Sequence, residues 1–130
     1  MGTEITISNN QLVQTIEEFG ITDVIRPLVK EIYLFDTYVA GTAYIDRKVR
    51  EGVSVGDKVI LRREQDNRFD DKAILILTAS QDKLGYVPEK DNSVFSRLMD
   101  AGKLLTARIK KIDWKGDFSK IEISIYLVDF

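Results

Sequence analysis

The sequence LRREQDNRFDDKA at residues 61–73, followed by the apolar run ILILTA and by LGYVP at residues 84–88, holds the main clue to the fold. A strand pattern leads into a loop rich in Asp, Asn and Arg, and a second strand pattern follows at once. Asn and Asp favour turns because their side chains hydrogen-bond the nearby backbone and tolerate unusual dihedral angles. The stretch therefore predicts two neighbouring strands joined by a polar loop.

One aromatic side chain, Phe69, stands in the middle of this polar loop. A turn does not need an aromatic ring, whereas a ring held among hydrogen-bonding side chains can stack on a flat polar ligand such as a nucleobase. The alternative is that Phe69 folds back as a lid on the hydrophobic core. The spacing of the residues leaves both interpretations open.

Two arginines, Arg62 and Arg63, end the strand that precedes this loop. Adjacent residues of a strand point to opposite faces, so one of the two can lie beside Phe69 and meet a phosphate. The alternative is that both are surface arginines that pair with Glu64 or Asp66.

The pattern outside this stretch is also mostly that of strands, with a period of two from Ile32 onward. We expect strands at residues 33–45, 55–64, 73–79, 83–88, 105–114 and 120–130, and a helix at 89–103. About six short strands with glycine turns and one inserted helix favour a mainly β fold, a small half-open β-barrel of SH3 or OB type. A two-layer α+β sheet is the alternative.

Two periodic patterns predict core positions. The expected core residues are Val94, Phe95, Leu98 and Met99 on the helix and Ile121, Ile123, Ile125 and Leu127 on the last strand. Asp91 or Asn92 can cap the helix at its N-terminus, and Gly102 can end it.

Residues 1–31 differ in pattern from the rest of the chain. Asn10 can cap a helix that Gly20 ends. We interpret this segment as an N-terminal helical arm that docks on a partner or supports a homo-oligomer. Residues 32–130 then form the β domain.

Length and composition favour one cytoplasmic domain. A chain of 130 residues with 44% hydrophobic and 31% charged residues is typical of a protein with a single core. The net charge of −2 provides no chain-wide positive field, which argues against strong non-specific DNA binding but allows a local basic face. Neither a signal peptide nor an apolar run of membrane-spanning length is present, so we expect no membrane contact.

The absence of Cys and His limits the chemistry that the chain can perform. It excludes a thiol nucleophile, a Ser-His-Asp triad and a zinc finger, and no nucleotide-binding P-loop motif is present. Asp66, Asp70 and Asp71 could in principle hold Mg²⁺, but a solvated turn is favoured. We therefore expect no catalytic residue, no metal and no cofactor.

Basic residues gather in the last two predicted strands around Trp114. They are Arg108, Lys110, Lys111, Lys115 and Lys120. Basic residues with an interleaved aromatic can form a nucleic-acid track. The favoured interpretation is an ordinary charged outer face, with Trp114 packed at one end of the barrel.

Three motifs, spaced along the chain, resemble those of the HIRAN domain family. They are VAGTAY at residues 39–44, GDKVILRREQDNRFDDKAI at 56–74, and LGYVP at 84–88 before a helix. The match runs from Leu34 to the C-terminus. The resemblance implies a small β-barrel that binds the 3′ end of single-stranded DNA.

The resemblance also implies roles for individual residues. Tyr44 and Phe69 would stack on bases, while Asn67 and Asp70 would recognise the terminal 3′-OH. An ionised Asp only accepts hydrogen bonds, so it suits a hydroxyl donor and repels a phosphate.

The chain departs from the DNA-binding form of the family at three positions. Ala43 replaces an Arg, Tyr86 replaces a His, and Glu89 replaces a Lys, although Lys90 is adjacent. Single-strand affinity depends on neutralised phosphates, so we expect weak and mildly salt-dependent binding. Arg63 and Tyr86 complete the candidate nucleic-acid-binding residues.

The leading hypothesis is therefore a non-catalytic module that binds single-stranded DNA ends, as a sensor of damaged or stalled DNA. The alternative is a protein-interaction or oligomerisation module with a vestigial DNA pocket, in which residues 1–30 mediate assembly. Oligonucleotides that differ only at the 3′ terminus would separate the two hypotheses.

Overall fold

The computed structural model describes residues 30–115 and 118–129. The chain divides into two units, and residues 31–128 form the unit considered below. Nearly all of the expected N-terminal helical arm, residues 1–31, lies outside the described residues. No helix in the described ranges is long and apolar enough to cross a membrane.

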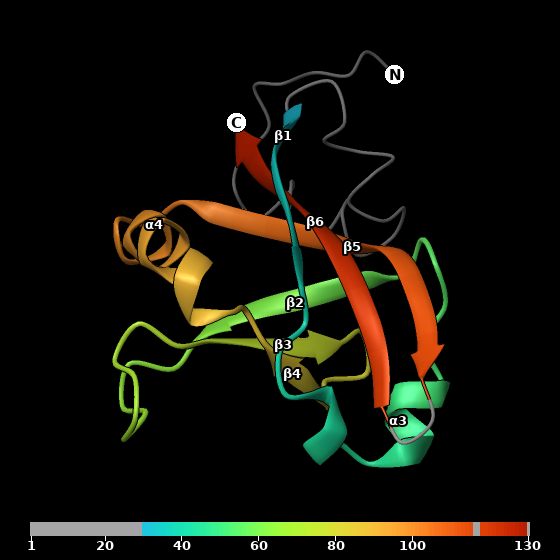
Figure 1. Ribbon diagram of the computed structural model, residues 1–130. Coiled ribbons are helices and arrows are strands. Elements are labelled where there is room, and N and C mark those ends of the chain that lie inside the picture. Colours follow the sequence, from blue (N-terminus) through green and yellow to red (C-terminus); the bar gives the residue numbers. More distant parts are fainter. Residues whose placement is uncertain (1–29, 116–117, 130) are drawn as a thin grey trace. The chain divides into compact units, whose positions relative to one another are not determined.

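The unit is built on one six-stranded antiparallel sheet that does not close into a complete barrel (Figure 1). Its strands are β1 (Lys30–Tyr38), β2 (Lys58–Arg63), β3 (Ile74–Thr78), β4 (Lys83–Tyr86), β5 (Leu104–Lys115) and β6 (Phe118–Asp129). The strand order is β1-β6-β5-β2-β3-β4, so β1 and β4 form the two edges. This fold confirms the prediction of a mainly β, half-open architecture with about six strands.

Three helical segments connect the strands. They are the 3₁₀-helix η2 (Thr42–Tyr44) and the α-helices α3 (Arg47–Glu51) and α4 (Glu89–Asp100). Figure 1 shows α4 at one end of the sheet and α3 at the other. The two α-helices correct the prediction of a single inserted helix.

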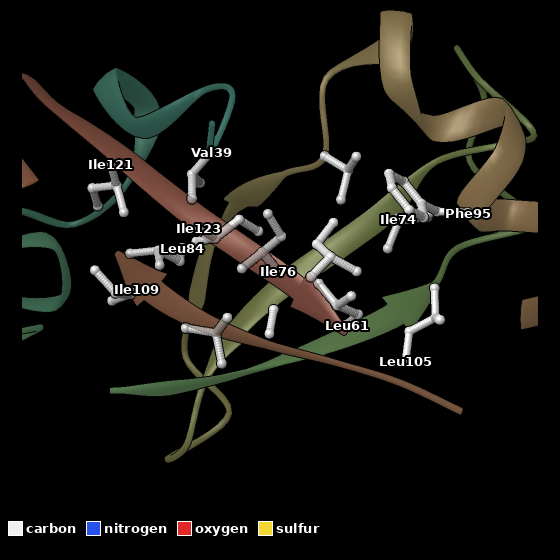
Figure 2. Packing of buried hydrophobic residues seen from close by; sticks show 14 of the residues in the cluster. Val39, Leu61, Ile74, Ile76, Leu84, Phe95, Leu105, Ile109, Ile121 and Ile123 are labelled. Atoms are coloured by element: carbon white, nitrogen blue, oxygen red, sulfur yellow. The ribbon is translucent and has the colours of Figure 1, made fainter. Parts of the chain in front are cut away.

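The hydrophobic core lies on the inner face of the curved sheet, where aliphatic side chains from different strands meet (Figure 2). Ile74, Ile76, Leu84 and the last-strand residues Ile121, Ile123 and Ile125 are fully buried. Phe95 of α4 covers one end of this cluster. The period-two pattern of β6 is therefore confirmed, except that Leu127 is only partly buried.

Two backbone hydrogen bonds bring the two edges of the sheet together just beyond β1. The Ala40 N–H donates to the Tyr86 carbonyl at 2.8 Å, and the Tyr86 N–H donates to the Ala40 carbonyl at 3.0 Å. The next residue back, Val39, donates its N–H to the Ile121 carbonyl of β6 at 2.8 Å. The segment after β1 thus joins β6 to β4 and half-closes the barrel.

A glycine makes this closure possible. A Cβ atom on Gly85 would lie 2.4 Å from the Ala40 carbonyl oxygen and 2.5 Å from Cγ1 of Val39. Real Cβ atoms do not approach other atoms so closely, so any larger residue must push the two segments apart. The glycine of the LGYVP motif is therefore a packing requirement.

The long strand predicted at residues 33–45 is wrong in its second half. The strand ends at Tyr38, because Gly41 adopts a left-handed conformation (φ +81°) that turns the chain into η2. The carboxylate of Asp46 then accepts a hydrogen bond from the Lys48 N–H and starts α3. Local turn chemistry overrides the strand propensity of the surrounding aromatic residues.

Helix α4 begins and ends differently from the prediction. Its N-cap is Pro88, not Asp91 or Asn92, whereas Gly102 (φ +88°) donates its N–H to the Met99 carbonyl and ends the helix as expected. Val94 is 63% exposed, so its predicted burial is wrong. The buried face runs through Asn92, Phe95 and Ser96, and the predicted core residues Leu98 and Met99 are partly buried against the core.

Replacing Gly85 by Ala is expected to destabilise the domain by roughly 3 kcal/mol, because the added methyl group overlaps the Ala40 carbonyl. Urea unfolding of the full chain measures this loss. Gly56→Ala is the control, since Gly56 also has positive φ (+92°) but no atom within 4 Å of its Cβ position. Its expected loss is about 1 kcal/mol from backbone strain alone. Equal losses in the two variants would contradict a steric role for Gly85.

Candidate nucleic-acid interface

The side chain of Asn67 fixes the backbone of the loop between β2 and β3. Its Oδ1 accepts hydrogen bonds from the backbone N–H groups of Phe69 at 2.9 Å and Asp70 at 3.0 Å. Its Nδ2 donates to Oε1 of Glu64 at 2.7 Å. This turn is the local structure that the Asn-rich and Asp-rich pattern predicts. The loop is therefore held in one conformation by its own side chains.

Asp70 ties the loop to helix α4. Its Oδ1 accepts the Lys72 N–H at 2.9 Å, and its Oδ2 accepts from Nδ2 of Asn92 at 2.6 Å. Asn92 is only 2% exposed, so this contact anchors the carboxylate to a rigid position. A carboxylate has about four acceptor sites, so two protein donors leave room for a further donor from a ligand.

Tyr86 connects the loop to the sheet edge. Its hydroxyl donates to Oε1 of Glu64 at 2.8 Å, the same oxygen that accepts from Asn67. Hydrogen bonds from the Asn67 amide and the Tyr86 hydroxyl, against the opposing effect of burial, hold the pKa of Glu64 below its ordinary value. Nζ of Lys83 lies 4.7 Å from the centroid of the Tyr86 ring. The candidate residues Asn67, Asp70 and Tyr86 thus belong to one connected network.

The two candidate stacking rings are almost fully exposed in the described part of the chain. Phe69 is 94% exposed and Tyr44 is 91% exposed. The alternative in which Phe69 covers the core is therefore wrong. Tyr44 lies on η2 and takes no part in the Glu64 network, but η2 directly follows the Ala40 pairing with Tyr86. Both rings present an aromatic face to solvent.

Arg63 is occupied by protein partners. Its Nε and Nη2 bind the Asp100 carboxylate at 2.8 and 3.1 Å, and its Nη1 and Nη2 donate to the carbonyls of Ala73 and Asp71. Arg62 points elsewhere and donates to Gln81 at 3.3 Å, as the strand alternation predicts. Arg63 therefore holds the loop base against the end of α4, and its guanidinium has little capacity left for a phosphate.

Two members of the network were not among the predicted site residues. Glu64 and Asn92 supply the acceptor and the donor that orient Asn67, Tyr86 and Asp70. The three-residue spacing of Glu64 and Asn67 is a usable sequence signal, whereas Asn92 resembles a helix cap in sequence. Across the described ranges, no three His, Cys, Asp or Glu residues group into a metal site, so the loop aspartates do not form the carboxylate cluster considered for Mg²⁺.

Two of the basic side chains of the β5–β6 hairpin are neutralised by β1. Arg108 pairs with Glu31 at 2.9 Å, and Lys110 pairs with Asp36, so two carboxylates of β1 cover two of these cations. Trp114 is 56% exposed, which contradicts its expected packing at one end of the barrel. Arg108 and Lys110 therefore do not provide free cations for a basic track along the hairpin.

A cavity of about 450 Å³ lies apart from the loop network. It is lined by residues of α3, the start of β2 and the β3–β4 turn, including Lys48, Lys58 and Ser80. None of the six candidate residues lines it.

Comparison with known proteins places this geometry in context. The HIRAN domain family model matches residues 32–128. A crystal structure of a protein from Lactobacillus plantarum is similar, with 28% identity and a TM-score of 0.72, covering 78% of this chain and 99% of that one. None of the curated proteins compared with the chain matches it.

Two structures of the HLTF HIRAN domain, one of them a crystal structure of the human domain, share the fold. The crystal structure has 17% identity and a TM-score of 0.64, covering 77% of this chain and 78% of that one. An NMR structure of the HLTF HIRAN domain in its DNA-bound conformation has 14% identity and a TM-score of 0.53, covering 75% and 79%. At this identity the likeness concerns the arrangement of the strands and helices.

Replacing Tyr86 by Phe is expected to cost about 1 kcal/mol of stability at neutral pH, because it removes one hydrogen bond to the Glu64 carboxylate. The pKa of Glu64 is lowered in the folded protein, so this contribution is present above its unfolded pKa and is lost as the pH falls through the folded value. The loss should therefore shrink toward pH 3. Urea unfolding across this pH range measures it.

Tyr44→Phe is the control, because the Tyr44 hydroxyl has no hydrogen-bond partner among residues 30–115 and 118–129. We expect this variant to unfold like the wild type at every pH. A Tyr86→Phe loss that stays constant down to pH 3 would contradict the ionised Glu64 acceptor.

Proposed function

Because the chain belongs to the HIRAN domain family, we propose that residues 32–128 form a non-catalytic module that binds single-stranded DNA and reads a free 3′-OH end. The family match and the DNA-bound conformation of the HLTF HIRAN domain support nucleic-acid binding. The recognition of the end is our inference from the side chains of the β2–β3 loop.

The observation that carries this proposal is the exposed ring of Phe69 on a rigid loop. Its ring is 94% exposed, while its backbone N–H and that of Asp70 are held by Asn67. An apolar ring in water gains free energy when a base covers it, and the fixed backbone lowers the entropy lost on binding. Base–aromatic stacking contributes about 1–3 kcal/mol per base. Tyr44 offers a second such surface.

Asp70 is the residue best suited to read the end of the strand. Asn92 and the Lys72 N–H hold its two oxygens in place, and each oxygen retains acceptor capacity. A free 3′-OH can donate to this carboxylate, whereas a 3′-phosphate brings a like charge close to it. The same group therefore favours one end and disfavours the other.

Electrostatics indicates modest affinity. The net charge is −2, and Arg63 is bound to Asp100 and to two backbone carbonyls. Arg68, next to Phe69, has no ion-pair partner in the described part of the chain and can approach a phosphate. Few neutralised phosphates imply a shallow dependence of affinity on salt.

Replacing Phe69 by Ala is expected to weaken binding of a short single strand by roughly 1–3 kcal/mol, because one stacking surface is lost. Thermal unfolding should be nearly unchanged, since the ring buries almost no surface. Fluorescence anisotropy with a labelled oligonucleotide measures the affinity. Trp114→Ala is the control, because Trp114 is exposed on the hairpin and outside the proposed site. A larger loss for Trp114→Ala would move the binding surface to the hairpin.

Replacing Asp70 by Asn is expected to reduce the preference for a 3′-OH over a 3′-phosphate, because it removes the charge that repels the phosphate. Asn retains one acceptor oxygen for Asn92 and loses the bond from the exposed Lys72 N–H, whereas Ala would leave the buried Asn92 amide unpaired. Asp66→Asn is the matched control, since it makes the same charge change on the exposed part of the same loop. The quantity compared is the ratio of the two affinities at fixed salt. A ratio near one in the wild type would favour the alternative protein-interaction module.

A further inference from the structure

One outer face of the half-closed barrel carries Tyr38, Ala40 and Tyr86. Val39 is 5% exposed and points into the core, so its neighbours Tyr38 and Ala40 point outward. Ala40 and Tyr86 are directly paired on antiparallel segments, so their side chains lie on the same face. The Tyr86 hydroxyl binds Glu64 of the loop network. This face is therefore continuous with the loop that carries Phe69 and Asp70.

Tyr38 is the meeting point of two lysines from different elements. Nζ of Lys120, at the start of β6, lies 4.7 Å from the ring centroid, and Nζ of Lys90, in the first turn of α4, lies 5.5 Å from it. The ring is 41% exposed. Two like charges beside one ring repel each other, and an anion bound between them would relieve that repulsion.

The charge balance at Tyr38 differs from that at Tyr126, another tyrosine of the sheet with a cation beside its ring. Arg108 lies 5.9 Å from the Tyr126 ring centroid, but Glu31 neutralises it at 2.9 Å. Lys120 has no ion-pair partner among residues 30–115 and 118–129. Lys90 has only a long contact of 3.8 Å to Asp91. The Tyr38 cluster thus keeps a net positive charge next to an aromatic face.

We infer that Tyr38, Lys90 and Lys120 form a second nucleotide subsite, in which the ring stacks on a base and the two ammonium groups hold an internucleotide phosphate. The inference rests on the proposed function and lengthens its binding site. A strand whose 3′ end lies at Asp70 would run past Tyr86 and Ala40 to Tyr38. Tyr38 and Ala40 are two residues apart on an extended segment, about 7 Å, so the subsite adjoins the first one.

The test uses oligothymidylates of increasing length with a free 3′-OH, and anisotropy titrations of the full chain at several salt concentrations. With about three phosphate contacts, the wild-type slope of log K against log salt should be near −2 for the longest strand. Lys120→Gln should make that slope shallower by about 0.7, which is one phosphate on a single strand. Tyr38→Ala should weaken the longer strands at least about fivefold while leaving the mononucleotide, which fills only the first subsite, unchanged.

Arg108→Gln is the matched control, because it also removes a cation from beside a tyrosine ring, that of Tyr126. Glu31 already neutralises this cation, so its loss should not change phosphate binding. Its slope should equal that of the wild type. Lys120→Gln keeps the Tyr38 ring and changes only an exposed side chain, so it separates loss of the subsite from loss of the fold. If the wild type binds and the salt slopes of Lys120→Gln and Arg108→Gln are identical, the second subsite alone is overturned. Absence of wild-type binding at every length would overturn the proposed function as well.

Discussion

The pairing of Ala40 with Tyr86 is the constraint on which the arrangement of this domain depends. A sheet with the order β1-β6-β5-β2-β3-β4 has two distant edges, and this pairing brings them together through two backbone hydrogen bonds. It requires the absence of a side chain at Gly85. It also fixes Tyr86 between the polar loop and the outer face of the barrel. The position of the candidate interface therefore follows from the closure of the sheet.

The polar residues of the interface act mainly on one another. Asn67, Glu64, Asp70 and Asn92 form hydrogen bonds that give the loop a single shape. Such a network stabilises the loop only when its buried members are satisfied, and Asn92 meets this condition through Asp70. The consequence is that an apolar ring, Phe69, stands in water on a rigid base. Rigid polar support below an exposed aromatic face is a favourable arrangement for stacking.

The sequence allowed much of the fold to be predicted, because most strands depend on a local period of two. The closing hairpin and the burial of Ile121, Ile123 and Ile125 follow from that period. The end of the first strand near Gly41 was harder to predict, since the glycine favours a turn whereas the surrounding aromatic and β-branched residues favour a strand. The exposure of Val94 depends on which side of α4 meets the sheet, and the local spacing does not specify this.

The candidate site was predicted only where its structure depends on residues close together in the sequence. The turn-forming role of Asn67 is local and follows from its residue type. The Asp100 partner of Arg63 is 37 residues away in the sequence, and the Asn92 partner of Asp70 is 22 residues away. Only the folded chain therefore reveals that Arg63 is held by protein groups and that Asp70 is anchored to α4. Whether Phe69 covers the core or faces solvent likewise depends on tertiary packing.

Glu31 and Asp36 of β1 pair with Arg108 and Lys110 of β5. The carboxylates of β1 therefore occupy two cations to which a polyanion would otherwise bind. Lys110 and the Ser124 hydroxyl lower the pKa of Asp36, which keeps this carboxylate ionised in mildly acidic solution. A tethered competitor is always present at high effective concentration, so a broad polyanion such as a duplex must displace it before it reaches the hairpin. By neutralising Arg108 and Lys110 from within the chain, the edge strand thus makes the hairpin a poor site for a broad polyanion.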